Sequence, residues 1–225
     1  MSGSSPQPIG DWLLLVDDPD DGAVGYNGHY LYVDADFTDD TLEFKVETWA
    51  TIPNAADSVL LAVYFDTDQN SATGLSSSTP DWAADAKPQS IGADYMMFVG
   101  SEPTDVGPIH TNVIFQWNAT DNSWDSIGTT LSPYQPANAD SVRGGISEAT
   151  LGNPSVIDVE AIFICEVAGS NEYRDRIPNS GHATIDLESG SATQAFSQAA
   201  GVAVDEGSGR KVSLITGKEL IEEAR

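Results

Sequence analysis

Oxygen-bearing side chains recur at every second position directly after an apolar run, at Asp66, Asp68 and Asn70. Calcium in proteins takes about six to eight oxygen ligands, and a tight loop can aim alternate side chains at one point. The same residue types also form Asx-turns, which close hairpins without any ion. The spacing therefore predicts either a Ca²⁺ site or a plain turn after this run.

The opening of this segment, D-x-D-x-N, matches that of an EF-hand loop, but the rest of the loop does not. Ser71 occupies the sixth position, where an EF-hand needs glycine, and Ser77 occupies the twelfth, where it needs glutamate. No helical pattern flanks the segment on either side. The loop is therefore not an EF-hand.

Aromatic residues supply the second candidate chemistry, because sugar-binding sites stack aromatic faces on pyranose rings beside hydrogen-bonding groups. Trp49 follows an alternating strand on its polar side, which predicts exposure. Trp82 lies in a polar loop without apolar neighbours. Trp124 and Trp117 flank a turn at residues 118–122, so they either bind a ligand or pair across a hairpin. The candidate ligand-binding residues are Trp82, Trp49 and Trp124, with packing as the alternative for each.

Catalytic signals are weak. The three histidines, His29, His110 and His182, are far apart in the sequence, and neither G-x-S-x-G nor H-E-x-x-H occurs. Cys165, the single cysteine, lies in the apolar run 161–165, which indicates a small buried hydrophobic residue rather than a nucleophile. We therefore predict that the chain is not an enzyme and has no catalytic residues.

The elements that must position these side chains are predicted to be strands. In the segment 41–51, Leu42, Phe44 and Val46 fall on one face and charged residues on the other, which is the period of a half-buried strand. The more continuously apolar segment 58–65 is typical of a strand covered on both faces. Other predicted strands span residues 30–33, 94–99, 112–117, 141–146, 156–165 and 182–187. Together they predict an all-β fold, an antiparallel two-sheet β-sandwich that is jelly-roll-like, with a short C-terminal appendage.

Composition divides the chain into four predicted parts. Residues 1–9 are expected to be a disordered N-terminal segment, 10–188 the β-sandwich domain, and 189–209 a polar linker. Residues 210–225 are expected to form a C-terminal strand or helix appendage, and their composition departs in charge from the rest of the chain. This appendage either has its own role, with self-association as one possibility, or is a frayed terminus.

Charge is the strongest global feature, with 35 acidic residues against 9 basic ones and a formal net charge of −26. Such a surface repels phosphate backbones and anionic headgroups, which disfavours nucleic acid and membrane partners. It suits either a halophilic or marine extracellular setting or specific calcium sites. No apolar run is long enough to span a membrane, and residues 1–6 lack the features of a signal peptide. We expect an extracellular or cell-surface location, with the signal peptide absent from this chain.

The residues 66–74, DTDQNSATG, followed by GADY at 92–95, resemble the D-T-D-x-N-x-x-T-G … G-A-D-Y signature of family-9 carbohydrate-binding modules and DOMON-like domains. Weaker similarity lies at 145–152 and 175–181. The resemblance implies a sandwich of two antiparallel sheets, with a structural calcium in many members and sugar binding in some. By position it implies four ion ligands, Asp66, Asp68, Asn70 and Asp94.

Taken together, these features predict a non-catalytic extracellular module that is stabilised by calcium and binds a polysaccharide or other glycan, or serves in adhesion. The alternative is a structural cell-surface protein, such as a surface-layer or filament subunit. In that case the protein would assemble through pairing of sheet edges, with the C-terminal segment contributing to self-association.

Overall fold

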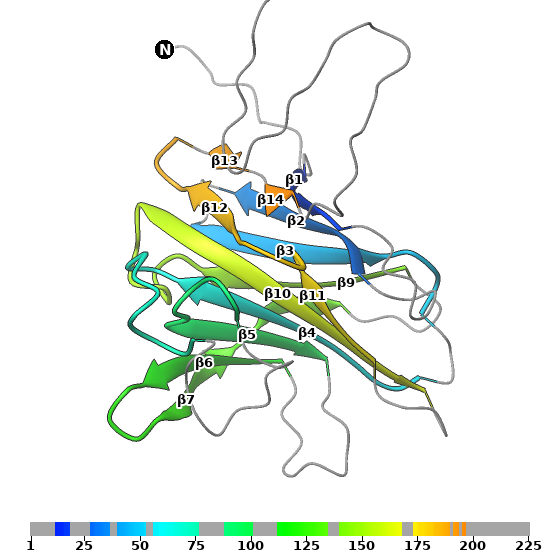
Figure 1. Ribbon diagram of the computed structural model, residues 1–225, viewed down its shortest axis with the longest axis horizontal. Helices are drawn as coiled ribbons and strands as arrows, with labels where there is room; N and C mark the ends of the chain where they lie inside the picture. The colour runs from blue at the N-terminus through cyan, green and yellow to red at the C-terminus, as the bar shows by residue number, and fades with distance from the viewer. Residues whose placement is uncertain are drawn as a thin grey trace, which may run out of the picture.

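The computed structural model describes residues 12–18, 28–36, 40–52, 56–76, 88–100, 112–134, 140–167, 173–189, 191–193 and 195–196. Within these residues the chain forms strands and no helix, and the strands make two sheets packed together (Figure 1). The predicted all-β sandwich is confirmed. The segments predicted as a disordered N-terminus, 1–9, and as an appendage, 210–225, lie outside the described residues.

Six strands form the smaller sheet, sheet A, in the order β14-β1-β2-β3-β9-β8. Their bounds are β1 Leu13–Asp17, β2 Gly28–Asp36, β3 Thr41–Thr48, β8 Leu131–Tyr134, β9 Ser141–Ser147 and β14 Ala195–Phe196. Neighbouring strands are antiparallel except for β1 and β14, which pair in parallel.

Eight strands form sheet B, in the order β13-β12-β10-β4-β5-β6-β7, with β11 also paired to β10. Their bounds are β4 Ala56–Asp66, β5 Tyr95–Gly100, β6 Val113–Asn118, β7 Ser123–Thr129, β10 Val156–Val167, β11 Tyr173–Ile177, β12 Ala183–Asp186 and β13 Ser191–Thr193. The long strand β10 pairs with β12 along its first half and with β11 along its second, while its other edge pairs with β4.

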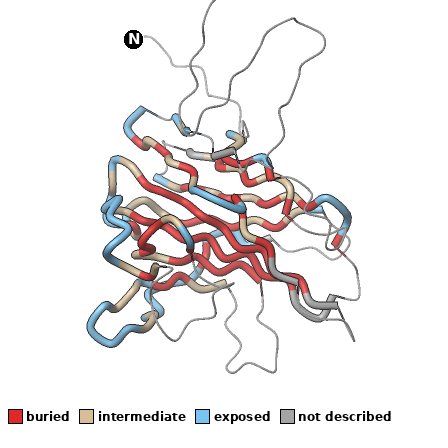
Figure 2. Tube along the Cα trace, in the orientation of Figure 1, coloured by how far each residue is buried: buried red, intermediate tan, exposed pale blue. Residues whose placement is uncertain are grey.

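The alternation in the sequence sets which side of each strand faces the core. In β3 the predicted inward residues Leu42, Phe44 and Val46 are fully buried, and the intervening residues are partly exposed. Phe44 meets Phe65 of β4 across the sandwich, with ring centroids 5.2 Å apart. Figure 2 shows buried residues along the middle of both sheets and exposed ones concentrated in the loops.

Sheet B is covered on both faces, as the continuous apolar pattern of β4 predicts. Its inner face joins the main core between the sheets. Its outer face carries a second cluster, in which Tyr64 and Ile162 from the strands lie with Leu75 and Ile91 from the segments before β5. Cys165 is buried in the main core as expected, and burial raises the pKa of its thiol to about 11. The outer cluster fixes the loops that carry the candidate site.

Two short strands, β13 and β14, lie within the segment 189–209 that composition predicts to be a polar linker. They pair with β12 and β1, so the sheets continue past residue 188. Small and polar residues form such edge strands through backbone hydrogen bonds, which leave little trace in the hydrophobic pattern.

Candidate metal centre

The loop after β4 is tightly folded. Gln69 and Gly74 both adopt left-handed backbone conformations, with φ values of 54° and 66°. Asx-type hydrogen bonds hold the turn: the Asn70 amide donates to Asp68 Oδ1 at 2.9 Å. Thr73 donates through both its amide and its hydroxyl to the Asn70 carbonyl. The loop therefore closes on itself within a few residues of the strand end.

The segment leading into β5 lies close enough to this loop for their backbones to exchange hydrogen bonds. Leu75 and Ala93 exchange two backbone hydrogen bonds of 2.8 Å, and the Asp94 amide donates to the Phe65 carbonyl. A Cβ on Gly92 would overlap the Thr73 carbonyl oxygen, so only glycine allows this approach. The close fit brings Asp94 beside the end of β4.

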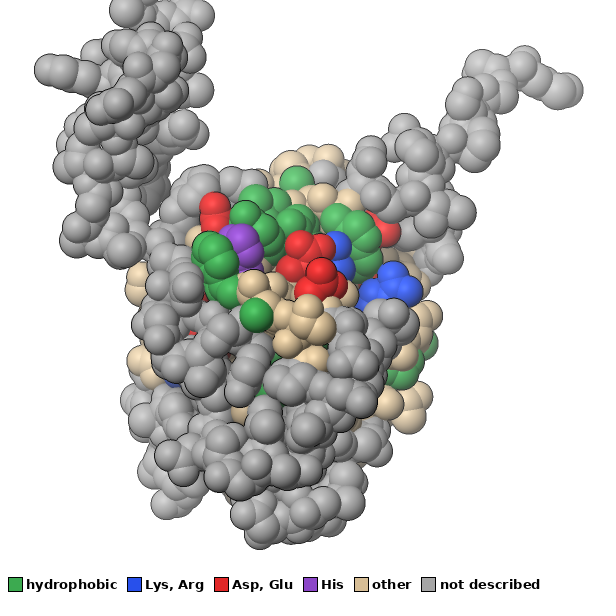
Figure 3. Space-filling model, turned by 90° about the vertical axis from the view of Figure 1, so that its right-hand side faces the viewer, with side chains coloured by type: hydrophobic (Ala, Val, Ile, Leu, Met, Phe, Trp, Pro, Cys, Tyr) green, Lys and Arg blue, Asp and Glu red, His purple; other side chains and the backbone are tan. Residues whose placement is uncertain are grey.

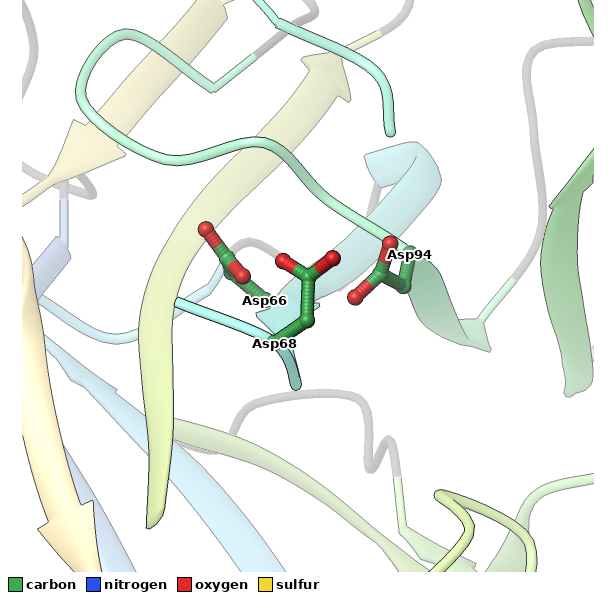
Figure 4. A group of neighbouring side chains, drawn as sticks. All are labelled: Asp66, Asp68 and Asp94. Atoms are coloured by element: carbon green, nitrogen blue, oxygen red, sulfur yellow. The ribbon is translucent and has the colours of Figure 1, made fainter. Parts of the chain in front are cut away.

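Three carboxylates meet at this point. Single carboxylate oxygens of Asp66, Asp68 and Asp94 all lie within 4.8 Å of one another. Figure 4 shows the three side chains converging, Asp66 from the end of β4, Asp68 from the loop and Asp94 from the residue before β5. Asp66 is 1 % exposed, Asp94 is half-buried and Asp68 is exposed. This group could hold a metal ion, and it brings together three of the four predicted ligands.

Hydrogen bonds orient each carboxylate. Asp66 accepts from the amides of Asn70 at 3.2 Å and Gly92 at 3.1 Å. Asp94 Oδ2 accepts from the amide and the hydroxyl of Thr67, at 3.0 and 2.8 Å. Within the described residues, no donor contacts the other oxygen of Asp94. The carboxylates are therefore preorganised while keeping lone pairs for an ion.

Asn70, the fourth predicted ligand, is exposed and takes part in the turn. Its side-chain oxygen accepts a hydrogen bond from the Ala72 amide at 3.2 Å. The hydrogen bonds of an Asx-turn are thus present, and they are compatible with the carboxylate cluster because the turn orients Asp68. The role of Asn70 as an ion ligand stays a prediction.

The electrostatics of the cluster favour a bound cation. Burial raises the pKa of Asp66, and the nearby charge of Asp94 raises it further, against the lowering effect of the Gly92 and Asn70 amides. Among the described residues, no lysine or arginine forms an ion pair with Asp66, Asp68 or Asp94. The donor set is entirely oxygen, which suits hard cations such as Ca²⁺ and Mg²⁺ and disfavours softer metals.

The raised pKa of Asp66 gives a pH prediction for the metal-free protein. Because the folded-state pKa lies above the unfolded one, this group favours folding most below the unfolded value of about 3.9, and that contribution is lost as the pH rises through the folded pKa. In excess chelator, we expect the unfolding free energy of the wild type to increase relative to that of Asp66→Asn as the pH falls from about 7 to about 4. Urea unfolding of both proteins across this range measures the difference, and a pH-independent difference would contradict the expectation.

A second buried acidic group lies on the same face of sheet B. Glu160 of β10 is fully buried and accepts hydrogen bonds from the amides of Gln89 and Ser90, at 2.8 and 2.7 Å, and from the Ser90 hydroxyl. Asp158 lies directly opposite Asp66 in the β10–β4 register. Neither residue was predicted from the sequence, although two acidic residues at alternate positions in an otherwise apolar strand are a recognisable signal.

Ser90, His182 and Asp158 form a chain of contacts that superficially matches a catalytic triad. Ser90 Oγ lies 3.0 Å from His182 Nδ1, and His182 Nε2 lies 3.6 Å from Asp158 Oδ2. However, the Ser90 hydroxyl donates to Glu160, so the histidine is not placed to remove its proton. The arrangement ties the segment before β5 to β10.

The tryptophans predicted to bind a ligand lie in different settings. Trp49 is 41 % exposed, as its position predicted, and stacks on His29 with ring centroids 3.6 Å apart. Trp124 is partly buried and meets Trp117 edge-to-face across the β6–β7 hairpin, at 5.1 Å. The predicted hairpin pairing is therefore present. Trp82 lies outside the described residues.

No protein-family model matches the chain, and no match was found among curated proteins or among solved structures. The resemblance to family-9 carbohydrate-binding modules and DOMON-like domains thus rests on the sequence motifs alone and stays a prediction. In the part of the chain that the structure describes, no helix has the length and hydropathy needed to cross a membrane.

Proposed function

We propose that this chain is a non-catalytic, extracellular module that is stabilised by calcium and binds carbohydrate or serves in adhesion. The observation that carries the proposal is the convergence of Asp66, Asp68 and Asp94 within 4.8 Å, on a loop preorganised by its own hydrogen bonds. The motif resemblance at residues 66–74 and 92–95 supports the same function.

Calcium is the cation that best fits this site. Its coordination is flexible, so the three carboxylates would form part of the ligand shell, with water or loop oxygens as the remainder. Extracellular modules bind calcium with dissociation constants of about 10⁻⁴ to 10⁻³ M, which a half-exposed site of this kind can match. An ion there would join the end of β4 to the start of β5.

Binding, rather than catalysis, is supported by how the buried polar groups are used. Glu160 and Ser90 hold the segment that precedes β5 against β10. Asp158 accepts a hydrogen bond from the Thr184 hydroxyl. These groups satisfy one another instead of facing a substrate.

The alternative function, a surface-layer or filament subunit, has one supporting observation. The chain passes from β7, an edge strand of sheet B, directly into β8, an edge strand of sheet A. Each carries an exposed apolar residue, Ile127 at 42 % and Leu131 at 41 %. Exposed edges of this kind are suited to strand addition. A surface-layer or filament function does not account for the cluster of Asp66, Asp68 and Asp94, so the binding module is preferred.

A glycan array probed with and without calcium tests the proposed function. We expect the protein to bind at least one glycan class in calcium and to bind it more weakly in excess chelator, because the ion holds the loops of the folded module in place. Absence of binding to every glycan under both conditions would contradict a carbohydrate-binding function.

A further inference from the structure

The outer face of sheet A carries a continuous group of aromatic and charged side chains. Because side chains alternate along a strand, the residues between the buried ones of β2 and β3 point away from the core. We name this surface the aromatic face and define it by Tyr30, Tyr32, Lys45 and Glu47 of these strands, together with Trp12, His29 and Trp49, which are linked to them by ring and cation–π contacts. Figure 3 shows a face where hydrophobic side chains and a histidine lie beside acidic and basic ones.

Ring contacts order one end of the aromatic face. The His29 ring lies between Tyr30, at 3.4 Å between centroids, and Trp49, at 3.6 Å. The Tyr30 and Tyr32 rings are 5.7 Å apart. Trp49 ends this run of rings and remains 41 % exposed, so it offers a large apolar surface that is already fixed in orientation.

Polar groups are fixed beside the rings. Lys45 Nζ lies 4.4 Å from the Tyr32 ring centroid and 4.8 Å from that of Trp12. The same nitrogen donates to Glu47 Oε1 at 2.7 Å. Burial and the neighbouring Glu47 raise the pKa of Tyr32 to about 12, so its hydroxyl stays protonated. Lys45 and Glu47 are thus held in place before any ligand arrives.

This arrangement has the chemistry of a sugar-binding surface. Aromatic rings stack on the apolar faces of pyranose rings, while a fixed ammonium donates hydrogen bonds to sugar hydroxyls and a fixed carboxylate accepts hydrogen bonds from them. Along β3, Lys45 and Glu47 point to the same side about 7 Å apart, since a strand rises about 3.4 Å per residue, and Trp49 follows directly after the strand end. A chain of sugars lying along β3 would meet these groups in succession.

We propose that the aromatic face binds a neutral polysaccharide, with one sugar ring stacked on Trp49 and neighbouring hydroxyls bonded to Lys45 and Glu47. The proposal rests on the carbohydrate-binding function proposed above and names its surface and its ligand class. The net charge of −26 repels uronate-containing or sulfated glycans, whereas a neutral polymer meets no such barrier.

Affinity electrophoresis in calcium-containing native gels tests this proposal. The probes are xylan, mannan and hydroxyethylcellulose as neutral polymers, and carboxymethylcellulose as the acidic counterpart of the last. We expect at least one neutral polymer to retard the wild type and carboxymethylcellulose to have no effect. Loss of one stacked ring costs about tenfold in affinity, so Trp49→Ala should be retarded about ten times less strongly.

The matched control is Ile127→Ala, which removes an equally exposed apolar side chain from β7 and should leave retardation unchanged. Trp49→Phe keeps an aromatic ring and should retain most of the binding, which guards against misfolding of the alanine variant. Undiminished retardation of Trp49→Ala would overturn the aromatic face as the site while leaving the proposed function intact. Retardation by carboxymethylcellulose alone, or by none of the polymers, would overturn the neutral ligand class, while the glycan array tests the function separately.

Discussion

Removal of calcium is expected to lower the melting temperature of the wild-type protein by about 5–10 °C and to leave that of Asp68→Ala unchanged. An ion that binds only the folded state at a concentration one hundred times its dissociation constant adds about 2.7 kcal/mol of stability. For a protein of this size, each kcal/mol shifts the melting temperature by about 2–4 °C. Asp68 is the suitable ligand to replace because it is exposed, so its loss disturbs packing least.

Scanning calorimetry in calcium and in excess chelator, at matched ionic strength, measures this shift. Matching is essential because a chain with a net charge of −26 responds to salt through screening alone. Glu188→Ala removes an exposed carboxylate outside the cluster, so it should retain the full response to calcium. Equal melting temperatures for the wild type in calcium and in chelator would show that the loop is only a turn.

Local patterns account for the parts of the fold that the sequence predicts well. The alternation in β3 and the continuous apolar run in β4 each depend on which faces of one strand are covered, so a single segment carries the signal. Strand β7 and the edge strand β8 expose most of their side chains, so hydrophobicity does not mark them. They form through backbone pairing with neighbouring strands, and the hydrophobic pattern of a segment does not indicate which strands these are.

The candidate site likewise has one part that the sequence predicts and another that only the tertiary structure shows. Asp66, Asp68 and Asn70 are close in sequence, and their spacing alone indicates a common point. The proximity of Asp94 follows from the antiparallel pairing of β4 with β5, which the motif resemblance implies but periodicity does not. The contact of Glu160 with residues 89–90 joins parts of the chain about seventy positions apart, and only the tertiary structure shows it.

Glu160 therefore links the core of sheet B to the segment that carries Asp94. Its two carboxylate oxygens accept three hydrogen bonds, two from backbone amides and one from the Ser90 hydroxyl, in a place where Glu160 itself is fully buried. Only residues 91–93 separate these donors from Asp94 of the metal cluster. We therefore expect the Glu160 carboxylate to be a positioning residue for the site.

Glu160→Ala is expected to lower the unfolding free energy by about 2–4 kcal/mol, because it leaves two backbone amides and a hydroxyl without their acceptor. A fully buried donor without a partner costs about 1–3 kcal/mol, and each of these costs less because the hydrogen bonds are only part-buried and water can replace the acceptor. Calcium affinity should fall as well, since the segment that presents Asp94 loses its attachment to β10. Urea unfolding in chelator measures the first effect and calorimetric titration with CaCl₂ the second. Glu43→Ala, on the outward side of β3, removes a carboxylate of the same type outside this network and should change both quantities little. A stability loss below about 1 kcal/mol for Glu160→Ala would contradict a structural role. An unchanged calcium affinity would show that Glu160 does not position Asp94.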